Sequence, residues 1–109
     1  MPNVAMALAA FGYDRITGIS LEEAGFTAAA ERAGQPARIR GRQIEEAERY
    51  MVLDDEALRR RLAKHGYRAV GAIRRDGGLM SAEAMRDGRA VTLHLDVNRR
   101  LVIESRPTS

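Results

Sequence analysis

The feature that most constrains the fold of this chain is an internal correspondence between its two halves. Shifted by 54 positions, residues 8–40 lie on residues 62–94 without a gap. The identical pairs are Leu8/Leu62, Ala9/Ala63, Gly12/Gly66, Tyr13/Tyr67, Ile19/Ile73, Ala28/Ala82, Ala30/Ala84, Arg32/Arg86 and Gly34/Gly88. Unrelated segments of this length would share roughly two residues by composition alone. The chain is therefore predicted to contain the same supersecondary unit twice.

Each copy is predicted to be a helix that ends at a Gly-Tyr pair and is followed by short strands. In the first half a helix is expected at about residues 3–11, with strands at 13–20, 26–32 and 36–40. In the second half Asp54 is the expected N-cap, and strands follow at 67–74, 79–86, 89–96 and 100–104. The Asp87-Gly88 pair is typical of a hairpin, because both central positions of a type I′ turn need a positive φ.

These patterns predict an α+β fold of two tandem helix-plus-antiparallel-β-meander repeats, with the helices packed on one face of the sheet. Residues 1–109 are expected to form a single domain, because a unit of about 50 residues buries too little apolar surface to be stable alone. Its predicted parts are a first, degenerate repeat at 1–41, a connecting helix at 42–53, a second repeat at 54–104 and a tail at 105–109. The face opposite the helices is expected to be wet or to face a partner.

Charge is distributed unevenly along the sequence, whose formal net charge is +3. Residues 1–54 carry six basic and eight acidic residues, whereas residues 55–109 carry twelve basic and seven acidic residues. Such an arginine bias can reflect coding composition alone, or it can mark a basic face for an acidic protein, a membrane surface or a nucleic acid. Nucleic-acid-binding sheets usually add exposed aromatic rings for base stacking, and this chain has no Trp. Nucleic acid is therefore not the favoured partner.

No catalytic, cofactor or metal site is predicted. His94 and Asp96 share a face of one predicted strand and could form an acid–base or metal-binding pair, but zinc needs more ligands than these two residues offer. The chain has no cysteine, which excludes disulfides and cysteine-ligated metals without deciding the compartment. The first residues are small and apolar, yet they lack the basic leader of a signal peptide.

A helix ending in Gly-Tyr, followed by a meander with an Asp-Gly turn, resembles the PepSY domain family. The segments that carry the resemblance are LAKHGYRAV, EAMRDGRAVTLHLD and NRRLVIE, which lie in the second half. In the first half, LAAFGYDRI and TAAAERAGQPARIR look like a degenerate copy without the last strand. The family's usual D-x-x-T-G-x-V ending is represented here by residues 96–102, where the Thr-Gly is missing.

The resemblance implies a non-enzymatic protein-interaction module, with a peptidase or another envelope protein as its partner. The implied compartment is the bacterial periplasm or the extracellular space, with the signal peptide absent from this sequence and the cytoplasm as the alternative. A small basic nucleic-acid-binding domain is the alternative function. Free sheet edges would also allow a homodimer by edge pairing. The partner surface is expected on the open sheet face and at the turns of residues 76–78 and 87–88, and it comprises Arg74, Arg75, Asp76, Asp87, Arg89, Thr92 and His94.

Overall fold

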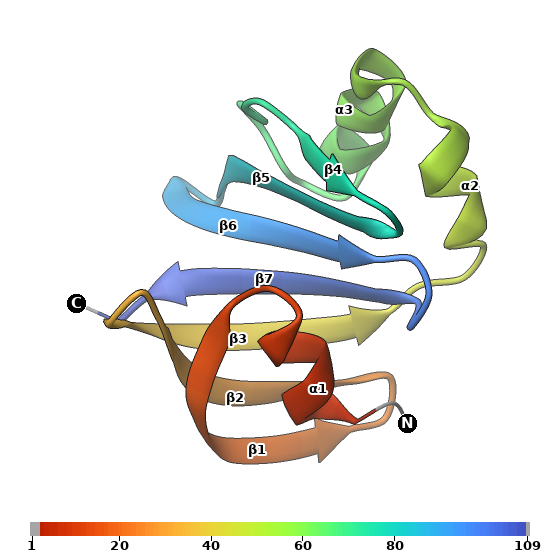
Figure 1. Ribbon diagram of the computed structural model, residues 1–109. Coiled ribbons are helices and arrows are strands. Elements are labelled where there is room, and N and C mark those ends of the chain that lie inside the picture. Colours follow the sequence, from red (N-terminus) through yellow and green to blue (C-terminus); the bar gives the residue numbers. More distant parts are fainter. Residues whose placement is uncertain (1–2, 109) are drawn as a thin grey trace.

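A computed structural model describes residues 3–108, which form one seven-stranded antiparallel sheet with three short helices (Figure 1). In the sheet the strands follow the order β1-β2-β3-β7-β6-β5-β4. The elements in chain order are α1 (Val4–Ala9), β1 (Tyr13–Glu22), β2 (Gly25–Arg32), β3 (Gln35–Gln43), α2 (Glu48–Val52), α3 (Asp55–Lys64), β4 (Arg74–Asp76), β5 (Leu79–Arg86), β6 (Arg89–Asp96) and β7 (Leu101–Pro107).

Local chemistry explains where the helices begin. The side chain of Asn3 accepts a hydrogen bond from the backbone N–H of Met6, and Asp54 accepts one from Ala57 at the start of α3. Each bond satisfies a donor that has no partner within the first turn of its helix. In α3, Leu58 and Leu62 face the core, as their spacing predicts.

The correspondence at 54 positions extends to the backbone. Five pairs of residues at this offset share an unusual positive φ of nearly the same size: Gly12/Gly66 (88° and 92°), Arg15/Ala69 (50° and 52°), Ala33/Asp87 (52° and 53°), Gly34/Gly88 (78° and 76°) and Glu46/Arg100 (56° and 57°). The two hairpin turns at 33–34 and 87–88 have a positive φ at both central positions, as a type I′ turn requires. The two halves therefore share these five backbone conformations, although they differ in their strands and helices.

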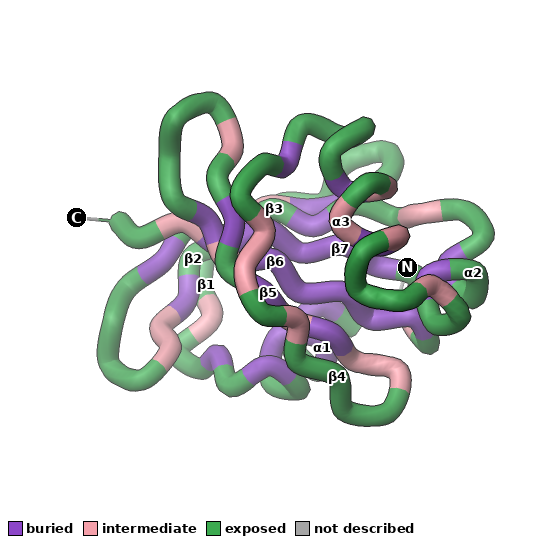
Figure 2. The backbone as a smooth tube through the Cα atoms, turned by 90° about the horizontal axis from the view of Figure 1, so that it is seen from above, coloured by how far each residue is buried: buried purple, intermediate pink, exposed green. Residues whose placement is uncertain are grey.

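The last strand, β7, lies in the middle of the sheet and pairs with both halves, with β3 on one side and β6 on the other. Five consecutive residues of β7, from Leu101 to Ser105, are buried. A strand that is buried at successive positions must be covered on both faces, since its side chains alternate between them. In Figure 2 the buried stretches accordingly concentrate on the central strands β6 and β7.

Two hydrophobic clusters cover the two faces. Leu101 and Ile103 pack with Leu8 and Phe11, at and just after α1. Val102, which points to the other face, packs with Leu58 and Leu62 of α3 and with their neighbours. The helices of the two halves therefore lie on opposite faces of the sheet.

The predicted fold class is wrong. The chain is not a pair of helix-plus-meander repeats with all helices on one face, because the sheet dominates and the helices are few and short. The two halves also differ, since β1 is ten residues long and β4 only three. The polar face of β6 in the second half is covered from the first half, where Phe11 follows α1 and stacks on His94. The alternation of residues within β6 does not predict this contact.

Three element boundaries also differ from the prediction. The strand expected at 67–74 is largely irregular, and only β4 (Arg74–Asp76) forms a ladder there. The helix expected within 42–53 is confined to α2, because β3 continues to Gln43. The tail expected at 105–109 is strand up to Pro107, since β7 pairs with β3 as far as that residue; Ser109 lies outside the described residues.

Candidate functional site

His94 lies at the centre of the α1 side of the sheet and is completely buried. Its ring stacks on Phe11 at a centroid distance of 4.5 Å. Its Nε2 lies 2.7 Å from the hydroxyl of Tyr13, and its Nδ1 lies 2.7 Å from the hydroxyl of Ser81. One half of the chain supplies Phe11 and Tyr13, and the other supplies His94 and Ser81. This cluster therefore joins the two halves.

The imidazole of His94 is neutral at ordinary pH. Burial, and then the positive charges of Arg32 and Arg74, lower its pKa to about 3. Burial also raises the pKa of Tyr13, so that its hydroxyl stays protonated. A neutral imidazole has one donor and one acceptor nitrogen, and here both have partners.

This cluster does not have the properties of an acid–base catalyst. A general base works best when its pKa is near the operating pH, and the pKa of His94 is far below that range. The ring is also closed to solvent, with 0% of its surface exposed. The neutral, fully hydrogen-bonded ring instead holds α1 and the two halves of the sheet together.

The prediction that His94 and Asp96 share an open sheet face is wrong, because both are completely buried. The two carboxylate oxygens of Asp96 accept hydrogen bonds from the backbone N–H and the guanidinium of Arg99, at 3.0 and 2.9 Å. Asp96 therefore stabilises the turn between β6 and β7. Within residues 3–108, no three His, Asp or Glu side chains form a group that could hold a metal ion.

The other residues predicted to bind a partner are dispersed. The turns at 76–78 and 87–88 lie at opposite ends of β5, which at about 3.4 Å per residue places residues 78 and 87 roughly 30 Å apart. The predicted partner residues therefore do not form one compact patch.

Two of these residues already have partners within the chain. The guanidinium of Arg75 contacts the carboxylate of Asp55 at 2.9 Å, and Thr92 donates to Glu83 at 2.9 Å. Arg74, Asp76, Asp87 and Arg89 are exposed.

The sheet edges are formed by β1 and β4. The pairing of β1 with β2 contains two register shifts, near Arg15 and Gly18, where φ is positive. Bulges and very short edge strands are features that natural sheets use against edge-to-edge pairing, and β4 has only three residues. A homodimer by edge pairing would have to overcome these features.

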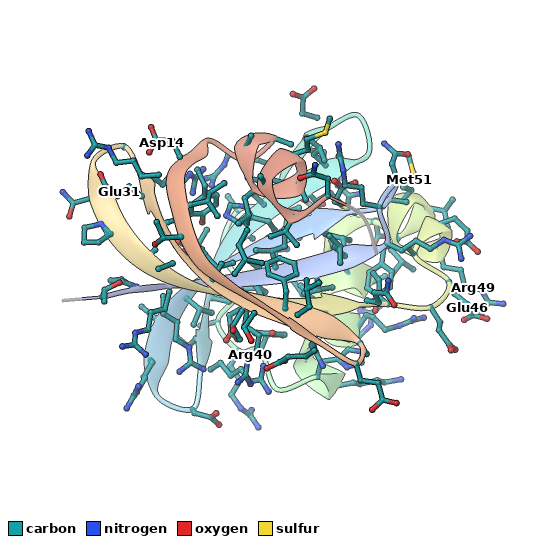
Figure 3. All side chains as sticks on the ribbon, turned by 90° about the horizontal axis from the view of Figure 1, so that it is seen from below. Asp14, Glu31, Arg40, Glu46, Arg49 and Met51 are labelled. Atoms are coloured by element: carbon teal, nitrogen blue, oxygen red, sulfur yellow. The ribbon has the colours of Figure 1, made fainter. Side chains whose placement is uncertain are left out.

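A row of exposed charged side chains lies elsewhere, on β3. Arg38, Arg40 and Arg42 are exposed and alternate with the buried residues Ala37, Ile39 and Gly41. Within residues 3–108, none of these three arginines has an acidic group within 4.0 Å, whereas other arginines do. We call these three residues the arginine row. Figure 3 shows Arg40 on the side of the sheet away from α1.

A hollow of about 520 Å³ lies beside the arginine row, on the face that α1 leaves open. Arg38 and Arg40 line it together with Thr27 of β2 and with Glu104 and Arg106 of β7. A hollow of this size is within the range of binding sites for ligands and peptide segments. Its lining comes from four neighbouring strands, β1, β2, β3 and β7, so the sheet itself determines its shape.

Glu104 is the one acidic residue in this hollow, and it is already neutralised. Only 5% of its surface is exposed. Its carboxylate oxygens lie 3.3 Å from Arg86 Nη1 and 3.2 Å from Arg106 Nη2. With Glu104 held between two guanidinium groups, the net charge of the hollow and of the arginine row remains positive.

The sequence does carry a signal for the arginine row. The segment Arg38-Ile39-Arg40-Gly41-Arg42 alternates charged and apolar or small residues, a pattern of period two that predicts a strand with one charged face. The strand predicted at 36–40 excludes Arg42, which falls in the helix predicted at 42–53, so the three arginines are not predicted to share one strand face.

The described residues include no helix that is long and apolar enough to cross a membrane. Comparisons of this chain with protein-family models, with curated proteins and with solved structures find no match.

Proposed function

We propose that this chain is a non-enzymatic protein-interaction module, PepSY-like as its sequence resemblance implies, and that it binds an acidic segment of its partner along the arginine row. The carrying observation is that Arg38, Arg40 and Arg42 are exposed on one face and that, within residues 3–108, none of them has an acidic group within 4.0 Å. Same-face neighbours on a strand are about 7 Å apart, so the three charges repel one another. An acidic segment would relieve that repulsion.

An extended acidic segment suits this surface better than a nucleic acid does. Sheets that bind single-stranded nucleic acids present aromatic rings on which bases stack. Here all aromatic side chains are buried: Phe11, Tyr13, Phe26, Tyr50 and Tyr67. Carboxylates need only the charge and the planar donors of guanidinium groups, which can bind them in a bidentate manner.

The class of partner and the cellular compartment in this proposal come from the sequence resemblance. The partner class is a peptidase or another envelope protein, and the compartment is the bacterial periplasm or the extracellular space, with the cytoplasm as the alternative. The proposal assigns His94 no catalytic role, since its two ring nitrogens are both hydrogen-bonded inside the core.

Fluorescence anisotropy at low ionic strength tests the proposal directly. The labelled ligands are an extended peptide that alternates Glu with Ser, the same peptide with Gln in place of Glu, and a mixed-sequence DNA oligonucleotide. The variants are Arg38→Gln/Arg40→Gln and, as a control with the same loss of charge, Arg60→Gln/Arg89→Gln. Both control residues are exposed and lie on other parts of the surface.

The Glu peptide should bind, the Gln peptide should not, and the row variant should weaken binding about tenfold, which corresponds to two moderately exposed charge pairs. The control variant should weaken it about twofold or less, through loss of general attraction. Equal losses in the two variants would contradict the proposal, and a loss confined to the control would move the site to the surface around Arg60 or Arg89. Tighter binding of the oligonucleotide than of the Glu peptide would favour the nucleic-acid alternative.

A further inference from the structure

A second hollow, of about 320 Å³, lies on the same face of the sheet, next to the far end of the arginine row. Along β3 and β7, Arg40 and Glu104 line the first hollow, and Arg42 and Val102, two residues along each strand, line the second. The wall opposite the sheet comes from the end of α3 and from Tyr50 of α2. We call this hollow the α3 pocket.

Both apolar and basic side chains line the α3 pocket. Ile44, Leu62 and Val102 line it together with the rings of Tyr50 and Tyr67, which are almost completely buried. Three basic residues also line it: Arg42 of β3, Arg61 of α3 and His65, which follows α3. The only acidic residue among the lining groups is Glu45, which is exposed.

The Arg61 guanidinium contacts an aromatic ring of the same pocket. It lies over the Tyr50 ring at 5.6 Å from the centroid, a cation–π arrangement that leaves the N–H groups at the edge of the guanidinium available for hydrogen bonds. Neither Arg61 nor Arg42 has an acidic group within 4.0 Å in the described chain. Two guanidinium groups from different elements therefore line the same pocket as the apolar side chains, and among residues 3–108 neither has a carboxylate within 4.0 Å.

We propose that the α3 pocket binds a small organic anion with an apolar body, such as a monocyclic aromatic or branched aliphatic carboxylate. The carboxylate would accept hydrogen bonds from Arg42 and Arg61, and the apolar body would displace water from Ile44, Leu62, Val102 and the two tyrosine rings. The volume is at the lower end of the range for ligand sites, which limits the ligand to about one ring. The same chemistry is presented by the last residue of a polypeptide that ends in an apolar side chain.

Amide chemical-shift titrations by NMR, with the whole chain, test the proposal and separate these two sources. The first probe is 3-phenylpropionate, with its neutral amide as the matched control. The second is a short acidic peptide that ends in Phe with a free carboxylate, compared with the same peptide amidated at its C-terminus. The variants are Arg42→Gln and Arg61→Gln, with Arg60→Gln as the control, because Arg60 is exposed and does not line the pocket.

3-Phenylpropionate should bind saturably and shift the amides of residues 42–45 and 61–67, and the neutral amide should bind at least about tenfold more weakly. Arg42→Gln and Arg61→Gln should each weaken binding about fivefold or more, whereas Arg60→Gln should have no effect. Arg42→Gln alters an exposed side chain, so its result does not depend on folding. Preferential binding of the peptide with the free carboxylate would assign the pocket to the chain end of a partner, and preferential binding of the free acid would assign it to a small molecule.

Preferential binding of the peptide and preferential binding of 3-phenylpropionate both support the site. Three results would overturn it: no saturable binding of 3-phenylpropionate or of the free-carboxylate peptide, equal binding of these acids and their amides, or a loss of affinity in Arg60→Gln equal to that in Arg42→Gln and Arg61→Gln. The Arg38→Gln/Arg40→Gln variant should bind 3-phenylpropionate as the unmodified chain does, because neither residue lines the α3 pocket. Loss of binding in that variant would also contradict the proposal. The α3 pocket can thus be refuted independently of the arginine row.

Discussion

Acidification should destabilise this protein through His94, well before its carboxylates are protonated. In the unfolded chain a histidine has a pKa of about 6.5, whereas burial, followed by the charges of Arg32 and Arg74, lowers the pKa of His94 in the fold to about 3. Protons therefore bind the unfolded chain more readily. Above about pH 6.5 this residue adds no pH dependence, and between pH 6.5 and pH 3 each unit of acidification should lower the free energy of unfolding by about 1.4 kcal/mol.

The informative range is from pH 7.5 to pH 5, because ordinary carboxylates remain ionised there. Over that range His94 should lower the free energy of unfolding by about 2 kcal/mol, a large part of the 5–15 kcal/mol that is typical of a domain. Equilibrium urea unfolding at several pH values measures this loss as a shift of the midpoint at constant slope.

The variant His94→Gln separates the titration of the ring from its packing. It removes the stacking on Phe11 and one of the two hydrogen bonds, so it should be less stable at pH 7.5 by about 1–3 kcal/mol. Its stability should then change little down to pH 5. The reasoning is refuted if the unmodified chain and the variant lose the same stability over this range. Should the variant fail to fold, the ring carbon and nitrogen shifts of His94 in the unmodified chain must still report a neutral imidazole at pH 5.

Two further substitutions test the packing of the sheet, each against a matched control. Gly41→Ala should lower the free energy of unfolding by about 1–3 kcal/mol in a urea titration, because its new methyl group would overlap the buried ring of Phe26. The control Gly71→Ala should be neutral or slightly stabilising, because its methyl group would meet no atom closer than 3.7 Å. Equal effects of the two substitutions would contradict this account. Arg59→Ala should cost about 1–2 kcal/mol in thermal or urea unfolding, since Arg59 binds two backbone carbonyls, whereas the exposed Arg60→Ala should stay within about 0.5 kcal/mol.

The parts of the fold that depend on neighbouring residues could be predicted from the sequence. The strands predicted at 79–86 and 89–96 are β5 and β6 with the same bounds, because alternation and the Asp87-Gly88 turn determine them locally. The cap at Asp54 is likewise present.

What the sequence did not reveal depends on contacts between distant residues. Val91, Leu93 and Leu95 point to one face of β6 and His94 points to the other, so the pattern predicts an exposed His94. In the structure Phe11, which lies 83 residues earlier in the sequence, covers its ring. No pattern within β6 contains that information. The run Leu101-Val102-Ile103 did carry a signal, because consecutive apolar residues indicate a strand that is covered on both faces.

The strand expected at 67–74 failed for a specific chemical reason. The carbonyl oxygens of Val70 and Gly71 accept hydrogen bonds from the Arg59 guanidinium at 3.1 and 2.9 Å. A side chain of α3 thus binds carbonyl oxygens that a regular strand ladder would otherwise use. Before β4 begins at Arg74, backbone bonds to β5 are confined to Arg68, which bridges Met85, and to Gly71, whose N–H donates to the carbonyl of Glu83. Propensity rules do not anticipate such a bond, because it joins residues of two different elements.

The position of β7 has a consequence for how this protein is made. The ribosome delivers β7 after all the other strands, yet it is the central one, and its pairing with β3 brings Ala37 next to Pro107 and Gln43 next to Leu101. Contacts between such distant residues form slowly. Until they form, the nascent chain carries two incomplete sheets, each with an open edge at β3 or β6, and such edges promote aggregation. Neither half can complete its core before synthesis of the segment is almost finished, so we expect the whole sheet to form in one late, cooperative step.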